Sequence, residues 1–247
     1  MKNAVIVLFL SIVFFNQSIF SQSAQTGTEG VSDSSRALQF QIGSNFTLSS
    51  FQGATISSKH HFTKEKALRL GLSIATGSSD QDQTADRSLG DSLVNISTGK
   101  TTNTSYSIQL SAQYVYYFNP KDKVLIYTGA GPSIGYDYMK RSSDLDGKSP
   151  GSYPVQSVSR GEEKTTSWSP GISGVVGVEW FAAKNISFLA EYGLVCRYFW
   201  SNYELKNFSQ TVYPTSQPYM ENNSKTESSG WSIANSGVKF GLTVYFQ

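Results

Sequence analysis

Three side chains near residue 60 have types that could carry out hydrolytic chemistry. Ser58 offers a hydroxyl nucleophile, His60 a base, and Glu65 a carboxylate that could orient that base. The chain has only two histidines, His60 and His61, so this is the one candidate for a histidine-based site. Polar residues beside a turn are the more ordinary interpretation of these positions. We therefore predict that the protein is not an enzyme and has no catalytic residues.

Metal, cofactor and disulfide chemistry is not indicated elsewhere in the sequence. Asp80, Asp82 and Asp86 are spaced as Ca²⁺ ligands could be, but the stretch lacks the glycine and the closing glutamate of a calcium loop. Cys196 is the single cysteine, so no internal disulfide can form. A net charge of +2 gives no reason to expect a nucleic-acid partner. We predict no metal, no cofactor and no nucleic acid.

The N-terminus has the pattern of a cleaved signal peptide. Lys2 precedes the apolar run AVIVLFLSIVFF, and small residues follow at Ser21 and Ala24. We predict a signal peptide over residues 1–21, or 1–24 if cleavage is later, then a short segment over 22–35 and a single domain over 36–247. No later run is long and apolar enough for a membrane helix. If the mature chain enters a membrane, it must do so as a closed barrel.

Eight segments alternate between apolar and small or polar residues with a period of two, which is typical of strands with two different faces. These segments are 38–48, 54–62, 68–75, 104–118, 124–138, 168–180, 186–200 and 232–246. Their apolar faces lie at even positions and carry no Asp, Glu, Lys or Arg. The charged residues within them, all at odd positions, are Lys59, Arg69, Asp137, Glu179, Glu191, Arg197 and Lys239.

This alternation decides between two barrel architectures. A secreted lipocalin-like barrel has an apolar interior, whereas a membrane barrel turns its apolar face to lipid and fills its lumen with small and polar side chains. Charges and glycines on the face opposite the apolar one favour the second arrangement. We predict an all-β fold, a transmembrane antiparallel up-and-down β-barrel of eight strands. A soluble antiparallel sandwich and a ten-stranded barrel remain as alternatives.

The connections between the segments differ sharply in length. Short turns at Thr63–Lys66, Asn119–Lys123 and Ala182–Asn185 join three pairs of strands. Long segments rich in Ser, Thr, Asn, Asp and Gly occupy roughly 76–103, 139–167 and 201–231. Short turns at one end and long loops at the other are typical of outer-membrane barrels, with the turns in the periplasm. We predict extracellular loops, periplasmic termini and a periplasmic 22–35 segment, although YPVQSVSR could extend the sheet above the membrane.

Aromatic residues gather at both ends of the predicted strands, as two interfacial girdles would. At the turn ends they are Phe118, Trp180, Phe188 and Phe246. At the loop ends they are Tyr136, Tyr138, Trp168, Tyr198 and Trp200.

The final stretch, GVKFGLTVYFQ, alternates up to the last residues and must close against the first strand. With this pattern the chain resembles the small eight-stranded outer-membrane barrels of Gram-negative bacteria, the OmpX, OmpA-barrel and opacity-like type. The resemblance covers about residues 36–247. It implies outer-membrane lipids and lipopolysaccharide as surroundings. It also implies that the barrel-assembly machinery reads Val244, Tyr245 and Phe246 as a C-terminal signal.

An eight-stranded barrel is only wide enough to be filled by its own side chains, so a general porin is not expected. We predict that the lumen holds a polar network in which opposite charges neutralise one another. Its members would be Arg69, Glu179, Glu191, Arg197 and Lys239. The predicted function is structural or surface-interacting, of an adhesion type, with an unidentified extracellular ligand bound by the three long loops. A narrow ion or solute channel is the alternative, and a lipid-modifying enzyme is the second alternative.

Overall fold

A computed structural model describes residues 33–43, 54–88, 94–118, 120, 122–149, 155–212 and 219–246. Within these ranges the chain forms eight strands: β1 (Arg36–Gly43), β2 (Ala54–His61), β3 (Lys66–Ser88), β4 (Val94–Phe118), β5 (Val124–Ser149), β6 (Val155–Ala183), β7 (Ile186–Val212) and β8 (Tyr219–Phe246). Strands adjacent in sequence pair antiparallel, and β1 pairs with β8, so the sheet closes. The predicted eight-stranded, up-and-down, all-β fold is confirmed. The predicted signal peptide and residues 44–48 of the first predicted strand lie outside the described residues.

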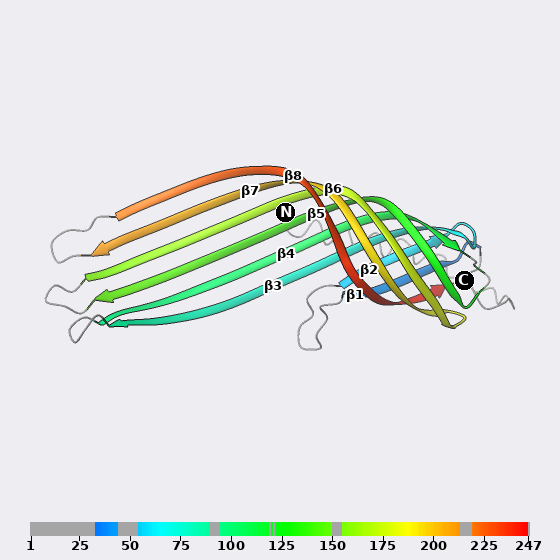
Figure 1. The fold of residues 1–247 in the computed structure, drawn as a ribbon, viewed down its shortest axis with the longest axis horizontal. Coiled ribbons are helices and arrows are strands. Elements are labelled where there is room, and N and C mark those ends of the chain that lie inside the picture. Colours follow the sequence, from blue (N-terminus) through cyan, green and yellow to red (C-terminus); the bar gives the residue numbers. More distant parts are fainter. Residues whose placement is uncertain are drawn as a thin grey trace.

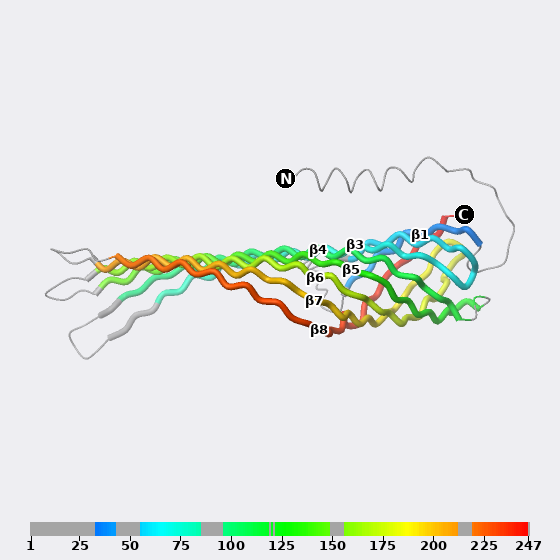
Figure 2. Tube along the Cα trace, turned by 90° about the horizontal axis from the view of Figure 1, so that it is seen from above, coloured from blue at the N-terminus to red at the C-terminus, as the bar shows by residue number. Residues whose placement is uncertain are grey.

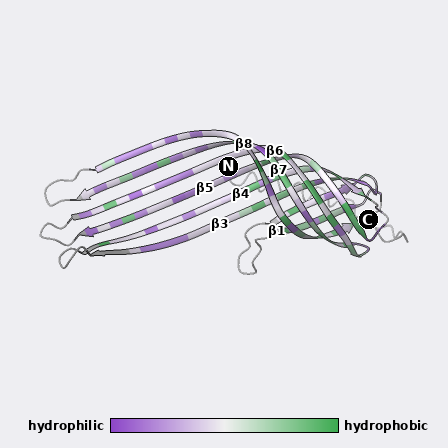
Figure 3. Ribbon diagram, viewed as in Figure 1, coloured by the Kyte–Doolittle hydropathy of each residue, from purple (hydrophilic) through white to green (hydrophobic). Residues whose placement is uncertain are grey.

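The barrel lies at one end of the molecule, where β1 and β2 complete the wall (Figure 1). Alternation sends odd positions inward, so Val115 and Tyr117 on β4 are fully buried, while their neighbours Tyr114, Tyr116 and Phe118 are exposed on the outside. Apolar residues colour the barrel strands in Figure 3, and hydrophilic residues dominate the far end of the molecule. The barrel therefore presents an apolar outer surface and encloses a packed interior.

Six strands, β3 to β8, continue past the barrel as one open sheet (Figure 1), which we call the extension. The hydrogen-bonded register runs almost to the hairpin tips, for example at Ser88↔Val94, Ser149↔Val155 and Gln210↔Tyr219. Figure 2 views this sheet edge-on and shows a single layer. Each strand carries about a dozen residues past the aromatic ends, which corresponds to roughly 40 Å at 3.4 Å per residue.

The extension corrects the prediction of three long polar loops. Most of 76–103, 139–167 and 201–231 is strand. The sequence rule failed because both faces of these strands are exposed, so no apolar alternation marks them, and because Ser, Asn, Asp and Gly are poor strand formers in isolation. Paired strands of the barrel supply the register that the composition does not reveal. The suggested sheet growth around YPVQSVSR is correct from Val155 onward.

A bulge in β8 corrects a second prediction, that of a uniform even apolar face over 232–246. Tyr192 pairs with Val238 but Leu194 pairs with Asn235, so β8 contains one extra residue there. Gly237 takes up the irregularity with φ of 65°, a left-handed conformation that glycine adopts without a steric penalty. Its amide donates to Asn235 Oδ1 at 3.2 Å. Beyond the bulge the faces exchange parity, and Trp231 and Ile233 point outward, about three-quarters exposed.

The two faces of the extension differ in how many charged residues they carry. The face continuous with the barrel exterior carries four cross-strand ion pairs between described residues, and the opposite face is rich in Ser, Thr, Asn and Gly. These pairs are Lys100–Asp80 (3.8 Å), Lys140–Glu162 (2.9 Å), Arg160–Asp144 (3.8 Å) and Lys225–Glu204 (3.1 Å). All are solvent-exposed, so they favour the strand register more than they stabilise the fold.

Candidate functional site

The barrel interior is closed near its turn end by a network around the Glu179 carboxylate. Glu179 lies on β6 and is fully buried. Its Oε2 accepts from Lys59 Nζ and from the Tyr117 hydroxyl, both at 3.0 Å. Its Oε1 accepts from Ser187 Oγ at 2.5 Å and from the Tyr245 hydroxyl at 2.8 Å. Four donors from four strands thus satisfy one carboxylate, an arrangement that holds the wall together from inside.

Aromatic rings surround the buried Lys59 ammonium. Lys59 Nζ lies 5.4 to 5.8 Å from the ring centres of Tyr117, Tyr127 and Tyr245 and donates to the Tyr117 hydroxyl at 2.6 Å. His61, also fully buried, packs against Tyr117 and Tyr245 with ring centres 5.2 and 5.8 Å away. The three tyrosine rings form the packed core of the barrel together with Ala37, Ala67, Val115, Leu125 and Phe181. This layer fills the lumen at the turn end.

A second network surrounds Arg69 and Glu191. It lies farther from the turn end of the barrel than the Glu179 network. Arg69 Nη1 donates to Glu191 Oε2 at 2.6 Å, and the same oxygen accepts from the Tyr127 hydroxyl at 2.9 Å. The rest of the guanidinium is held by Gln113, whose Oε1 accepts from Nε at 2.9 Å and also from Nη2. Gln113 Nε2 in turn donates to Ser173 Oγ at 2.8 Å. Glu191 therefore neutralises the charge of Arg69, and Gln113 fixes the orientation of the Arg69 guanidinium.

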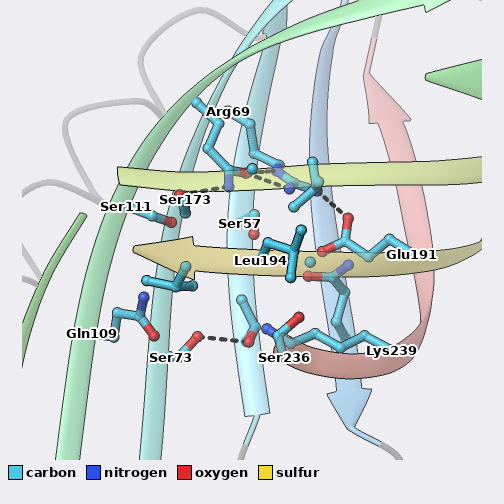
Figure 4. Close-up of a pocket in the computed structure, with 17 residues that line it drawn as sticks. Ser57, Arg69, Ser73, Gln109, Ser111, Ser173, Glu191, Leu194, Ser236 and Lys239 are labelled. Carbon is cyan, nitrogen blue, oxygen red and sulfur yellow. Dashed lines mark hydrogen bonds and ion pairs between the residues drawn. The ribbon is translucent and has the colours of Figure 1, made fainter. Parts of the chain in front are cut away.

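A cavity opens above this second network, on the side of the extension (Figure 4). Its volume is about 60 Å³, and serine and glutamine side chains line most of it, with Arg69, Glu191 and Lys239 as its charged residues. Lys239 pairs in register with Glu191, yet the Glu191 carboxylate bonds to Arg69 and Tyr127 instead. Among the described residues, no ion pair of Lys239 or of Arg197 lies within 4 Å.

The five residues predicted for the lumen network thus divide into two groups. The structure joins Arg69 to Glu191 and places Glu179 in its own network, whereas Arg197 and Lys239 join neither pair. The predicted network did not include Lys59, Tyr117, Tyr127 and Tyr245, although Lys59 had been recognised as an odd-position charge. All four stand at odd, inward positions, so their parity was the signal that could have found them. The sequence analysis considered aromatic residues only as members of the lipid-facing girdles, so the inward-facing tyrosines were not assigned to the lumen network.

The candidate hydrolytic set does not assemble in the described part of the chain. Ser58 and His60 share the outward face of β2, but no hydrogen bond joins them, and His60 packs edge-on against Phe62 with ring centres 5.3 Å apart. Glu65 is exposed in the following turn, where its amide donates to Thr63 Oγ1 at 3.3 Å. Nothing in this geometry aligns a nucleophile with a base.

The predicted girdle residues lie on the outside of the strands, and several contact one another. Trp180 and Phe188 stack near the turn end, with ring centres 5.9 Å apart. At the level where the extension begins, Tyr136 meets Trp168 and Tyr198 meets Trp200, both at 4.8 Å. Of the predicted C-terminal signal, Phe246 is exposed, Val244 is half-buried and Tyr245 turns into the lumen to donate to Glu179. The assembly role of these three residues stays a prediction.

Electrostatics in the extension are local. The hydrogen bond and the charge of Lys140 lower the pKa of the Glu162 carboxyl, and Glu162 raises the pKa of the Lys140 ammonium. In the same way Lys225 lowers the pKa of Glu204. No group of three or more His, Cys, Asp or Glu residues in the described ranges could hold a metal ion. The described residues also contain no helix with the length and hydropathy of a membrane span.

Comparison with known proteins identifies the family of this chain. The sequence model of the outer membrane protein beta-barrel domain matches residues 7–213. No curated protein matches the chain. Similar solved structures include OprG from Pseudomonas aeruginosa, with 9% identity, 90% of this chain and 100% of that chain covered, and a TM-score of 0.39. Ail from Yersinia pestis is similar at 10% identity, with 86% and 94% covered and a TM-score of 0.29. Likenesses this distant say nothing about activity.

Proposed function

This chain belongs to the outer membrane protein beta-barrel domain family, and from that premise we propose that it is a surface-interaction protein of an adhesion type. In this proposal the extension stands outside the cell and binds an extracellular ligand. The short turns and both termini face the periplasm, and lipid and lipopolysaccharide surround the barrel. The barrel is then a rigid mount and not a conduit or a catalyst.

The observation that carries the proposal is the contrast between a filled lumen and a long, paired extension. The Glu179 and Arg69 networks and the core rings fill the barrel at its turn end. By contrast, six strands are held in register for roughly 40 Å past the barrel, although both faces there are exposed and little apolar area is buried. Such a sheet costs conformational entropy without burying a core, which suits a surface that is kept for binding.

The extension also has two edges whose backbone groups can pair with another strand. Along the described residues, β3 beyond Ile74 pairs only with β4, and β8 before Val238 pairs only with β7. The outer parts of both edges therefore offer unpaired N–H and C=O groups, the feature that strand addition by an extended peptide uses.

The experiment removes the extension without disturbing the barrel register. Two-residue Asn-Gly turns would join Thr76 to Tyr106, Tyr138 to Thr166 and Trp200 to Ser229, which are directly paired residues. Cells that display the intact or the trimmed protein would be compared for adherence to matrix proteins, serum proteins and partner cells. Both versions should show the heat-dependent gel shift of a folded barrel. The proposal predicts adherence by the intact protein alone.

Equal adherence by the folded, trimmed barrel would contradict the proposal, as would the absence of adherence by either version. A matched control shortens only the β5–β6 hairpin, joining Tyr138 to Thr166, which leaves the outer edges of β3 and β8 in place. If the edges bind, this control should retain more adherence than a variant shortened at the β3–β4 and β7–β8 hairpins.

A narrow channel is the second candidate function, and the polar cavity beside Lys239 is the observation that favours it. The packed layer of Tyr117, Tyr127, Tyr245 and His61 lies between that cavity and the turn end, so conduction would require these side chains to move. In planar bilayers we expect no steady conductance from the intact chain. Sustained single-channel steps that are lost in Glu191→Gln would favour the channel over the surface-interaction proposal.

A further inference from the structure

The inward-facing charges of the barrel do not balance. At lumen-facing strand positions the described residues include four cations, Lys59, Arg69, Arg197 and Lys239, against three carboxylates, Asp137, Glu179 and Glu191. Two ion pairs consume four of these charges. Asp137 accepts from Ser107 Oγ at 2.7 Å. This leaves a cationic excess in the upper lumen, where Lys239 lines the cavity.

Glu191 does not cancel the charge of Lys239, although the two residues face each other across β7 and β8. The Glu191 carboxylate is committed to the Arg69 guanidinium at 2.6 Å and to the Tyr127 hydroxyl. Arg69 and Lys239 both line the cavity with that single carboxylate, so the three groups together carry one positive charge. An uncompensated charge in a half-buried site is unfavourable, and a counter-ion from solution relieves it.

A buried amide side chain faces the same space. Gln41, on β1, lines the cavity, and its side chain is almost fully buried at 3% exposure. Its Nε2 atom makes no hydrogen bond of good geometry among the described residues, and its amide lies within reach of the Glu191 carboxylate. Gln41 pairs with Gly241, two residues from Lys239 on the neighbouring strand, so the amide and the ammonium are diagonal neighbours on the lumen wall. Figure 4 shows the Lys239 side chain extending toward Ser236.

The size of the cavity limits what can neutralise it. A volume of about 60 Å³ accommodates several water molecules, since about 10–15 Å³ suffices for one. A halide or a similarly small monovalent anion therefore fits with part of its hydration shell, and a larger organic anion does not. Ser57 and Ser236, which also line the space, can supply further hydroxyl donors.

We propose that the upper lumen is a binding site for one small monovalent anion, held by the Lys239 ammonium and the Gln41 amide. The site is separate from the surface-interaction proposal, because it lies inside the barrel and does not require the extension. It assigns a ligand class, small inorganic anions, to the polar cavity beside Lys239.

Bromide is a suitable probe for this site. The refolded full-length chain in detergent would be titrated with bromide while the ⁸¹Br line width is recorded. The intact protein should give saturable broadening that chloride reverses and that gluconate, which is too large for the cavity, does not. Lys239→Gln should weaken bromide binding at least tenfold. Lys148→Gln, the same change at an exposed lysine of the extension, should leave it unaltered.

Lys239→Arg keeps the charge and should retain binding, so it separates the loss of a cation from the loss of a fold. Every variant must show the heat-dependent gel shift. Absence of saturable broadening with the intact protein would overturn the proposal. Equal binding by folded Lys239→Gln, or equal competition by gluconate, would place the signal on the protein surface and would overturn it as well.

Discussion

The six strands β3 to β8 bury their ion pairs inside the barrel and expose them to solvent in the extension. Inside the barrel wall, β6 buries Glu179 among four donors, and β7 buries Glu191 against Arg69. Past the aromatic ends, the ion pairs between the same strands are exposed to solvent, for example Lys140–Glu162. Ion pairs of similar length therefore differ in their environment, because one set is shielded from water and the other is not. The comparison teaches that burial, and not geometry alone, decides which pairs stabilise this fold.

The largest expected effect comes from breaking the buried pair. Glu179→Gln removes the charge that compensates Lys59 and leaves a buried ammonium, which should cost roughly 3–5 kcal/mol of the free energy of unfolding. Urea unfolding in lipid vesicles, followed by tryptophan fluorescence, measures this loss. The matched variant in the extension, Glu204→Gln, should change the barrel's unfolding little, because its pair with Lys225 is exposed.

A double variant sharpens this test. Lys59→Met combined with Glu179→Leu removes both charges, and we expect it to recover much of the stability that Glu179→Gln loses. If the single and double variants are equally unstable, the loss reflects packing around Tyr117 and Tyr245 and not an uncompensated charge.

A smaller effect is expected at the bulge where β8 crosses from barrel to extension. Gly237→Ala places a side chain at φ of 65°, and this should cost about 1–2 kcal/mol of unfolding free energy. Gly174→Ala is the control, because a Cβ there meets only the Gly129 carbonyl at 3.9 Å. The two variants can be compared by urea unfolding. Equal stability of both would contradict the left-handed bulge and the change of parity above it.

The smallest effect is expected from an exposed pair of the extension. Because Lys140 lowers the pKa of Glu162, the ionised carboxylate is favoured in the paired sheet, and its contribution is present above the ordinary value of 4.5. That contribution is lost as the pH falls through the lower folded-state pKa. Amide exchange around residues 139–142 should therefore lose slight protection on acidification, corrected for intrinsic rates. Glu162→Gln should remove the pH response. Glu163→Gln should keep it, because no ion pair within 4 Å joins Glu163 to another described residue.

Sequence alternation predicted the barrel well because lipid and lumen impose different chemistry on adjacent residues. The even face of 104–118 and the odd charges at Glu179 and Glu191 follow directly from that constraint. Beyond the aromatic ends the constraint disappears, since both faces are exposed, and the strands of 139–167 could not be recognised from composition. The bulge at Gly237 could not be predicted from the sequence either. It adds one residue to β8 and so exchanges the inward and outward faces, but no change in residue type marks it.

The lumen network was predictable in kind but not in pairing. Inward parity identified Arg69, Glu191 and Lys239 together, but only their three-dimensional positions show that Arg69 takes the carboxylate and that Lys239 does not. Tyr245 illustrates the same limit. It belongs to the predicted C-terminal signal, and its hydroxyl also closes the Glu179 network.

Amide hydrogen exchange of the intact protein in lipid bilayers tests most directly whether the extension is an ordered sheet. We expect the central strands β5 and β6 to be protected through 139–149 and 155–167, with faster exchange at the outer edges of β3 and β8, where one side is unpaired. Rapid, uniform exchange across 76–103, 139–167 and 201–231 would instead mean that these segments are loops, and the contrast between barrel and extension would fail.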